Sequence, residues 1–192
     1  MRLLLSRIWL FLWRWKVVDN DEIPAKCVVI AAPHTTNWDF PITMAMAAVK
    51  GVDIRWLGKA QMFNSVLGPF FRWMGGISVQ RDNPGDLVAD LAAEFSHHDS
   101  LALVVPAEGT RSAVEYWKSG FYRIATEAGV PIVCAFVDKS TRSGGFGPVI
   151  VPSGDVKADM DIIRAFYADK TGLKANRFNE PRLRDESPLG ER

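Results

Sequence analysis

The stretch Cys27-Val-Val-Ile-Ala-Ala-Pro-His-Thr-Thr-Asn-Trp-Asp39 passes from an apolar run to a polar turn, and it decides the fold. The run from Cys27 to Ala32 is short, rich in β-branched residues and closed by a proline, which is typical of a buried strand. The following residues, from Phe40 to Val49, are apolar and rich in Ala and Met, which predicts a buried helix after Asp39. A strand, a polar turn and a helix in succession indicate an α/β protein.

The same alternation continues along the chain. Further strands are predicted at 53–58, 76–80, 101–105, 131–137 and 149–151, and helices at 64–73, 84–97, 119–128 and 159–170. The strands are nearly all apolar, as in a sheet that is covered on both faces. We therefore expect a single α/β domain over residues 20–173, with a mostly parallel central sheet flanked by helices. The Gly-rich stretch 143–147 is interpreted as a turn, and the polar stretch 174–192 as a flexible tail.

Composition excludes several classes of protein. Hydrophobic residues make up 48% and charged residues 23% of the 192 residues, which excludes a disordered chain. The 23 Lys and Arg nearly balance the 22 Asp and Glu, so no global charge favours a nucleic-acid partner. Cys27 and Cys134 lie in apolar runs and are expected to be buried free thiols. With three histidines, they leave little for a structural zinc site, and we expect no metal.

The N-terminal segment 1–19 combines cations with Trp and Leu. Arg7 and Arg14 interrupt its apolar run, which is therefore too short for a transmembrane helix, and a signal peptide is a weaker alternative. On a helix, one face would carry an apolar stripe of Leu4, Leu5, Ile8, Phe11, Leu12 and Trp15. This pattern predicts an amphipathic helix at a membrane interface. The alternative is a helix docked on the protein's own core.

The polar turn after the first predicted strand contains His34 and, five residues later, Asp39. In an open α/β sheet, reactive groups gather at the carboxyl ends of the strands. If the turn is helical, the Asp39 carboxylate can bond one ring nitrogen of His34 and leave the other free as a general base. Such a dyad has no nucleophile of its own, so a substrate alcohol would have to supply one. The simpler alternative is a surface turn in which Asp39 only caps the helix.

A second polar segment, Val105-Pro-Ala-Glu-Gly-Thr-Arg-Ser112, follows the predicted strand 101–105. The planar guanidinium of Arg111 suits phosphate or carboxylate, and Gly109 and Thr110 would let backbone N–H groups point at an anion. Glu108 could orient Arg111 or bond a substrate hydroxyl. A turn with a structural ion pair is the alternative. Two further cations, Lys59 and Arg81, follow apolar strands and are expected at the same sheet edge.

In their order and spacing, these motifs resemble the glycerophospholipid acyltransferase family, which includes the 1-acylglycerol-3-phosphate acyltransferases. The resemblance covers His34-x4-Asp39, the Gly75-Gly-Ile stretch with Arg81, the Pro106-to-Arg111 segment and Val130-Pro-Ile132. Family members often have Asn before the His and Ser two residues after it, where this chain has Pro33 and Thr36. Ala107 is an insertion between the usual Pro and Glu.

The resemblance implies transfer of a fatty acyl group from acyl-CoA or acyl carrier protein to a lysophospholipid-like acceptor. His34 would be the general base and Asp39 its partner. Lys59, Arg81 and the block of Glu108, Gly109, Thr110 and Arg111 would bind the acceptor. No cofactor beyond the acyl thioester cosubstrate is expected. The implied location is cytoplasmic, peripherally attached to the inner face of the cell membrane.

Two other functions remain open at this point. The same dyad could activate water, which would make the protein a thioester or ester hydrolase. Alternatively, His34 could be structural in a non-catalytic lipid- or anion-binding module. For the oxyanion of an acyl transfer, backbone N–H groups of the Thr35–Trp38 turn or near Gly109 are the candidates.

Overall fold

A computed structural model describes residues 2–19, 22–79 and 84–187. The seven strands are β1 Lys16–Asp19, β2 Lys26–Ala31, β3 Ile54–Lys59, β4 Gly76–Val79, β5 Leu101–Val105, β6 Ile132–Asp138 and β7 Ser143–Ile150. The helices are α1 Arg2–Leu12, α2 Asp39–Lys50, α3 Ala60–Phe63, α4 Gly68–Trp73, α5 Pro84–Glu94, α6 Gly120–Ala128 and α7 Val156–Tyr167, with a 3₁₀ turn at Ala175–Arg177. The predicted α/β class is confirmed.

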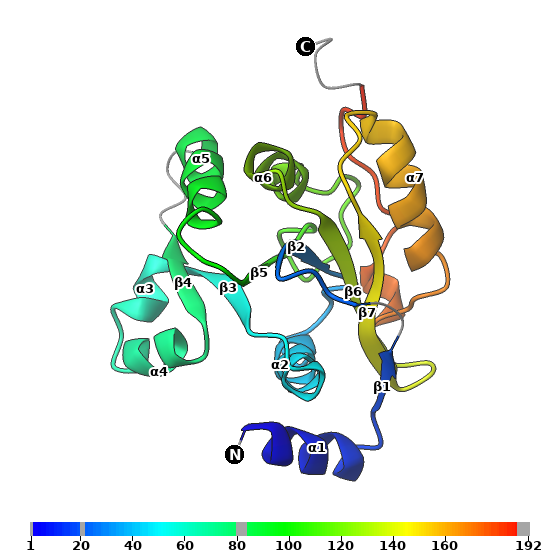
Figure 1. Cartoon of the computed structure of the whole chain (residues 1–192). Coiled ribbons are helices and arrows are strands. Elements are labelled where there is room, and N and C mark those ends of the chain that lie inside the picture. The colour runs from blue at the N-terminus through cyan, green and yellow to red at the C-terminus, as the bar shows by residue number, and fades with distance from the viewer. Residues whose placement is uncertain (1, 20–21, 80–83, 188–192) are drawn as a thin grey trace.

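The strands form one sheet in the order β1-β7-β6-β2-β5-β3-β4 (Figure 1). Only the β6–β7 pair is antiparallel, so the expected mostly parallel sheet is confirmed. The central strand β2 lies between β5 and β6 and is parallel to both. Its carboxyl end therefore shares one edge of the sheet with the carboxyl ends of β3, β4, β5 and β6.

Alternate residues of β2 point to opposite, fully buried faces of the sheet. Val28 and Ile30 join a core with α5, α6 and α7, whereas Cys27 and Val29 join a core with Ala47 of α2. Burial on both sides explains why the strands read as continuous apolar runs. Cys27 and Cys134 are buried free thiols, as the sequence predicts.

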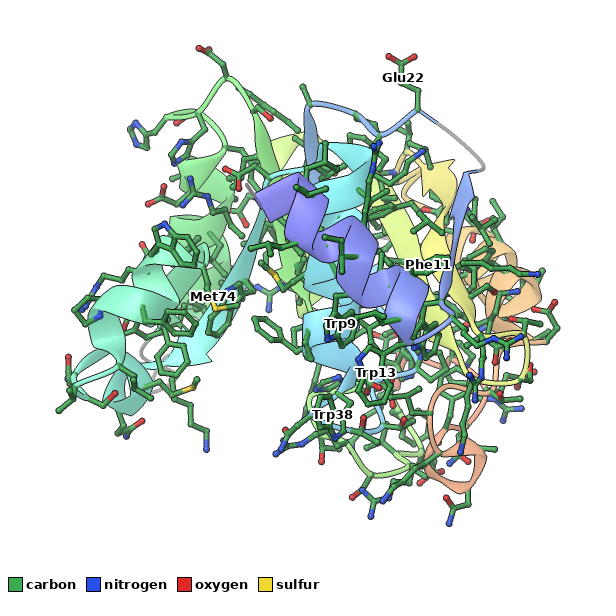
Figure 2. The ribbon with its side chains drawn as sticks, turned by 90° about the horizontal axis from the view of Figure 1, so that it is seen from below. Trp9, Phe11, Trp13, Glu22, Trp38 and Met74 are labelled. Atoms are coloured by element: carbon green, nitrogen blue, oxygen red, sulfur yellow. The ribbon has the colours of Figure 1, made fainter. Side chains whose placement is uncertain are left out.

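Helix α1 lies across α2 on the outside of the molecule (Figure 2). It docks through Leu10, which packs with Ile42 and Met46 of α2. The stripe predicted from the sequence behaves differently, because Leu4, Leu5, Ile8, Phe11 and Leu12 are exposed while Trp15 is half-buried against the docked side. The helix thus docks on the core by one face and shows an apolar face to solvent. Within the described residues, no helix has both the length and the apolar content to cross a bilayer.

The prediction of a turn at the Gly-rich stretch 143–147 is wrong, because these residues begin strand β7. Close packing explains the glycines, since a Cβ on Gly144 would lie 2.6 Å from Met46 Sδ, and one on Gly145 would lie 2.4 Å from the Val18 carbonyl oxygen. Absent side chains let α2 and the edge strand β1 approach β7. Sequence analysis assigned no strand to β1.

Two further boundaries differ from the sequence prediction. Of the helix expected at 64–73, only α4 (Gly68–Trp73) is helical, and the separate short helix α3 (Ala60–Phe63) precedes it. Gly68 lets the two approach, because a Cβ there would lie 2.0 Å from the Phe63 carbonyl oxygen. Helix α7 begins three residues earlier than predicted, because the Asp155 carboxylate caps it by accepting the Ala158 N–H at 3.0 Å.

The sequence predicts a flexible tail over 174–192, but residues 174–187 pack on the domain; residues 188–192 lie outside the described residues. Leu183 is buried and forms a β-bridge with Trp117. Arg164 of α7 donates to the Pro181 carbonyl and to the Glu186 carboxylate. The segment is polar in composition, but a buried apolar side chain, Leu183, and a charged one, Glu186, hold it against the domain.

Candidate active site

The polar turn after β2 and the polar turn after β5 lie side by side because the two strands are neighbours in the sheet. The first turn carries His34 and leads into α2, whose first residue is Asp39. The second begins at Pro106, directly after Val105, and carries Glu108 and Arg111. The topology therefore brings the two strongest sequence motifs to one place, as predicted for the carboxyl edge of an open sheet.

His34 and Asp39 face each other. The His34 Nδ1 atom lies 3.4 Å from Asp39 Oδ2, with the His34 side chain 29% exposed and the Asp39 side chain 6% exposed. This distance is slightly longer than an ordinary hydrogen bond. The Asp39 carboxylate faces the ring at Nδ1, and Nε2 is the ring nitrogen on the side away from it.

The Asp39 carboxylate also holds the turn itself. Its Oδ2 accepts the N–H groups of Thr35 at 2.6 Å and Thr36 at 2.7 Å, and its Oδ1 accepts the Thr36 hydroxyl at 3.0 Å. The Thr36 hydroxyl in turn accepts the Trp38 N–H at 3.1 Å. One buried carboxylate thus closes the turn at the start of α2 and also faces the imidazole, so the contacts of both alternatives are present together.

Glu108 contacts the backbone of the His34 residue. Its Oε1 accepts the His34 N–H at 2.6 Å, and the residue is only 2% exposed. Burial raises the pKa of Glu108 to about 7; the hydrogen bond from the His34 backbone lowers the pKa and the nearby Asp39 raises it. The sequence analysis gave this carboxylate to the acceptor, whereas in the structure it positions the residue expected to be the base.

Arg111 reaches the first turn from the second. Its guanidinium donates to the Asn37 side-chain oxygen, three residues after His34. Arg111, Gly109 and Thr110 are all exposed, and Gly109 adopts a positive φ of 69°. Lys118 lies beside this turn, since its Cγ would be 3.3 Å from a Cβ placed on Gly109. The turn therefore presents cations and polar groups to solvent next to His34.

The remaining predicted cations are less closely placed. Lys59 is exposed at the end of β3, which is separated from β2 by β5, and among the described residues it does not line the pocket beside His34. Arg81 lies outside the described residues. The acceptor-binding role implied for both remains a prediction.

A cavity of about 390 Å³ opens beside the dyad. His34, Asn37 and Asp39 supply its polar wall together with Thr43. The rest of the lining is mostly apolar and comes from α2, β3, α3, α4 and the ends of β5 and β6, including Phe40, Met44, Ile54, Trp56, Leu57, Met62, Phe71, Val104 and Phe136. An apolar cavity with a few polar groups at one place suits a ligand with a long hydrocarbon part and one reactive group.

The segment from Thr171 to Arg177, which we call the strap, contacts the turn that carries His34. The Lys174 N–H donates to the Thr35 hydroxyl at 3.1 Å, and the Arg177 guanidinium lies 3.4 Å from the Thr35 carbonyl oxygen. Gly172, with a φ of 63°, packs so closely that an added Cβ would lie 2.8 Å from Pro33 Cβ. The strap is itself anchored where Thr171 donates twice to Asp138 at the end of β6.

Several backbone N–H groups that the sequence offered as oxyanion donors already donate to other acceptors in the structure. The N–H groups of Thr35 and Thr36 donate to Asp39, that of Trp38 donates to the Thr36 hydroxyl, and that of Gly109 donates to the Pro106 carbonyl at 3.0 Å.

Burial raises the pKa of both Cys27 and Cys134 to about 12, so neither thiol is an available nucleophile near neutral pH.

Sequence reasoning missed three parts of this site. Asn37 lay inside the quoted motif and received no role, although an amide three residues after a candidate base is a signal that could have drawn attention. Thr35 is fully buried, and its N–H, hydroxyl and carbonyl all have partners. The strap residues gave no signal, because their polar sequence resembles that of any surface segment.

The chain has recognisable similarity to known proteins. Residues 14–138 match the family described as Acyltransferase. A curated relative from Mycoplasma pneumoniae, described as a probable 1-acyl-sn-glycerol-3-phosphate acyltransferase, is 28% identical over 123 residues. The match covers 61% of this chain and 46% of the relative, so the chain spans about half the length of the curated protein that it matches.

A solved structure has a similar fold. The crystal structure of the 1-acyl-sn-glycerophosphate (LPA) acyltransferase PlsC from Thermotoga maritima superposes with a TM-score of 0.62. The sequences are 15% identical, and the superposition covers 88% of this chain and 77% of the other. At this identity the likeness concerns the fold. The strap from Thr171 to Arg177 lies beyond the residues that match the family.

Proposed function

Because this chain belongs to the acyltransferase family, we propose that it moves a fatty acyl group from a thioester donor, acyl-CoA or acyl carrier protein, to a lipid hydroxyl. The proposed acceptor is a lysophospholipid-like molecule such as 1-acylglycerol-3-phosphate, in keeping with the distant likeness to proteins of that description. His34 and Asp39 act as the general-base dyad.

One observation carries the proposal. An imidazole oriented by a buried carboxylate forms the polar wall of a cavity that is otherwise apolar. The dyad supplies a base without a nucleophile, and the cavity has room for a hydrocarbon chain. These two properties together favour a reaction in which one substrate brings a hydroxyl and the other a fatty acyl group.

In the proposed reaction, His34 Nε2 takes the proton of the acceptor hydroxyl as its oxygen attacks the thioester carbonyl carbon. The tetrahedral intermediate collapses by breaking the carbon–sulfur bond. The departing thiolate receives the proton from the imidazolium, so the products are an ester and a free thiol. Asp39 holds the ring and stabilises its positive charge, while Glu108 fixes the backbone of the same residue.

The apolar and the charged surroundings of the dyad suit different parts of the substrates, a fatty chain and an anionic head group. In this proposal, the apolar cavity lined by α2, β3 and α4 holds the fatty acyl chain that is transferred. An anionic head group would lie outside, at the exposed turn with Arg111, where a guanidinium can bond phosphate oxygens in pairs. Lys59 and Arg81 would contribute charge at the same edge.

We also propose that the protein works at a membrane surface, peripherally and at the cytoplasmic face. The exposed stripe of α1 would lie in the interface, and the cations Arg7 and Arg14 beside it would contact lipid head groups. A lipid acceptor then reaches the dyad without leaving the vicinity of the bilayer.

The decisive experiment incubates the full chain with labelled acyl-CoA or acyl carrier protein and a panel of lysophospholipids and amphipathic alcohols, with products identified by mass. A new ester that depends on the acceptor supports the proposal. Free fatty acid regardless of acceptor would indicate the hydrolase, and no thioester turnover would indicate a binding module. His34→Ala should lower turnover by roughly 10²- to 10⁴-fold while the protein stays folded.

Arg111 can be tested within the same assay. Arg111→Ala should raise the acceptor KM with little change in kcat, because the side chain is placed to bind rather than to transfer protons. Arg182→Ala is the matched control, since Arg182 is also exposed and pairs with Glu180. An unchanged KM in Arg111→Ala would remove Arg111 from the binding site.

A further inference from the structure

A second apolar surface lies beside α1 and is not explained by the chemistry at His34. It is formed by the α3–α4 lobe, residues 60–73, which exposes Met62, Val66, Leu67, Phe70 and Trp73. Val66 is 97% exposed, and Trp73 is 63% exposed. Large apolar side chains gathered in this way mark an interaction site.

The lobe is held in this shape by its inner side. The Phe63 ring is buried between β3 and β4, where a Cβ on either Gly58 or Gly76 would approach it to 2.7 Å. Phe63 and Phe71 contact Trp56, which lines the cavity beside the dyad. The exposed residues are therefore the outer side of a fixed element and do not have room to fold inward.

The lobe and α1 border one groove. This groove, of about 710 Å³, is lined by Leu3, Leu5 and Ile8 of α1 on one side and by Trp73 and Met74 on the other. Figure 2 shows Met74 between α1 and the lobe. Met44 and Ile54 line both this groove and the cavity beside the dyad, so the two apolar spaces share a wall.

The segments that form α1 and the α3–α4 lobe differ from the rest of the chain in net charge. Residues 2–18 contain four Lys and Arg, residues 54–79 contain three, and neither segment contains an Asp or Glu. The rest of the chain then carries 16 cations against 22 acids. Asp53 also lines the groove and pairs with Arg55, so cations outnumber acids around these apolar side chains but are not the only charges there. Apolar side chains with an excess of cations, on a protein that is otherwise acidic, are complementary to an anionic lipid surface.

We propose that the α3–α4 lobe is a second membrane contact, which acts with α1 to seat the groove on an anionic bilayer. The choice of a lipid partner rests on the proposed function, but the contact itself does not depend on the chemistry of His34. Two contacts fix the orientation of the cavity toward the bilayer, which a single helix lying in the interface would leave free to rotate. They also add their binding free energies.

The test measures binding of the full chain to vesicles of phosphatidylcholine with 30% phosphatidylglycerol, by co-sedimentation. The variant is Val66→Ser with Phe70→Ser, and the matched control is Val151→Ser with Ile162→Ser, which removes exposed apolar side chains elsewhere. We expect the lobe variant to bind about tenfold more weakly, from the lost apolar contact, and the control to bind like the wild type. Pure phosphatidylcholine or 0.5 M salt should weaken wild-type binding.

Several outcomes would overturn the inference. Equal binding by the lobe variant and the wild type would do so, as would an equal loss in the control pair. A wild-type dimer that becomes monomeric in the lobe variant would instead assign the surface to a second copy of the chain. Turnover with an acceptor presented as monomers should be unchanged in the lobe variant, which shows that it is folded. Vesicle binding needs no turnover, so this test can fail while the proposed acyl transfer stands.

Discussion

At the sheet edge that carries His34, buried polar groups are paired with one another, whereas the face formed by α1 and the α3–α4 lobe holds large apolar side chains in solvent. Asp39 and Glu108 are almost completely buried, and each accepts backbone N–H groups of the His34–Thr36 segment. On the other face, Phe11 is 80% exposed. The protein completes the first region by itself, while the second is complementary to something outside it.

This difference matters because the two regions should respond to substitution in different ways. Removing a buried partner leaves an unpaired polar group behind, which destabilises the fold and shifts His34. Removing an exposed apolar side chain leaves nothing unpaired, so only binding to the external partner should change. The following predictions test that contrast, beginning with the largest expected effect.

Asp39→Ala should cause the greatest loss. It removes the orienting contact to His34 and the acceptor of two backbone N–H groups, each of which should cost about 1–3 kcal/mol when left unpaired. We expect turnover to fall by roughly 10²- to 10⁴-fold and thermal stability to fall as well. Asp39→Asn keeps an acceptor oxygen and should retain more stability than activity. Wild-type turnover in either variant would contradict the dyad.

Glu108 should make stability depend on pH. Its pKa is raised from 4.5 to about 7 by burial, so between these values the native state binds more protons than the unfolded state. Its contribution is fully present below pH 4.5 and is lost as pH rises through 7, which corresponds to about 3 kcal/mol.

Urea unfolding of wild type and Glu108→Gln at pH 5 and pH 8 measures this effect, because glutamine does not titrate. The free energy of unfolding should fall less between these pH values in Glu108→Gln than in the wild type. Glu127→Gln is the control at an exposed position of α6 and should behave like the wild type. An identical pH dependence in all three proteins would contradict the inferred burial of a charge.

Gly172→Ala tests whether the strap positions the catalytic turn. The new Cβ would overlap Pro33 and approach Thr35 Cγ2 to 3.2 Å, so we expect kcat to fall about tenfold as the turn shifts. Gly129→Ala is closely matched, since Gly129 also has a φ of 63° and an added Cβ there has nothing within 4 Å. Both variants should lose about 1 kcal/mol from backbone strain. Equal kcat values in the two would argue against positioning by the strap.

Val66→Ser should have the smallest effect on the isolated protein. Since Val66 is almost fully exposed, the free energy of unfolding should change by less than about 0.5 kcal/mol. The same substitution at the buried Val133 should cost about 2 kcal/mol or more. A clear destabilisation by Val66→Ser, measured by urea unfolding, would mean that the lobe is completed within the protein and not by a membrane.

Sequence analysis predicted those features that follow from local composition. Strands β2, β5 and β6 were identified because residues buried on both faces must be apolar, and α2 because an apolar segment begins at a residue that closes a turn. The pairing of His34 with Asp39 was also accessible, because both residues belong to one turn and helix entry. Lys59 and Arg81 were placed only by their positions after strands, and that signal does not specify a contact.

Other features depended on neighbours that are distant in sequence. The glycines of β7 appeared to form a turn because their packing against Met46 and Val18 cannot be read locally. Glu108 seemed available to a substrate, although its partner is a backbone N–H that lies 74 residues earlier. Helix α1 was predicted from its periodicity, but which face docks was decided by Leu10 meeting α2.

The amino-acid sequence alone therefore determined the α/β class, the apolar strands and the two polar turns, because burial and turn chemistry act on neighbouring residues. Only the tertiary structure decided that Glu108 and the strap hold the His34 turn, and that α1 and the α3–α4 lobe border one groove. Such contacts depend on which strands become neighbours and which glycines admit close approach. Both are properties of the assembled sheet and its helices, and no short segment contains them.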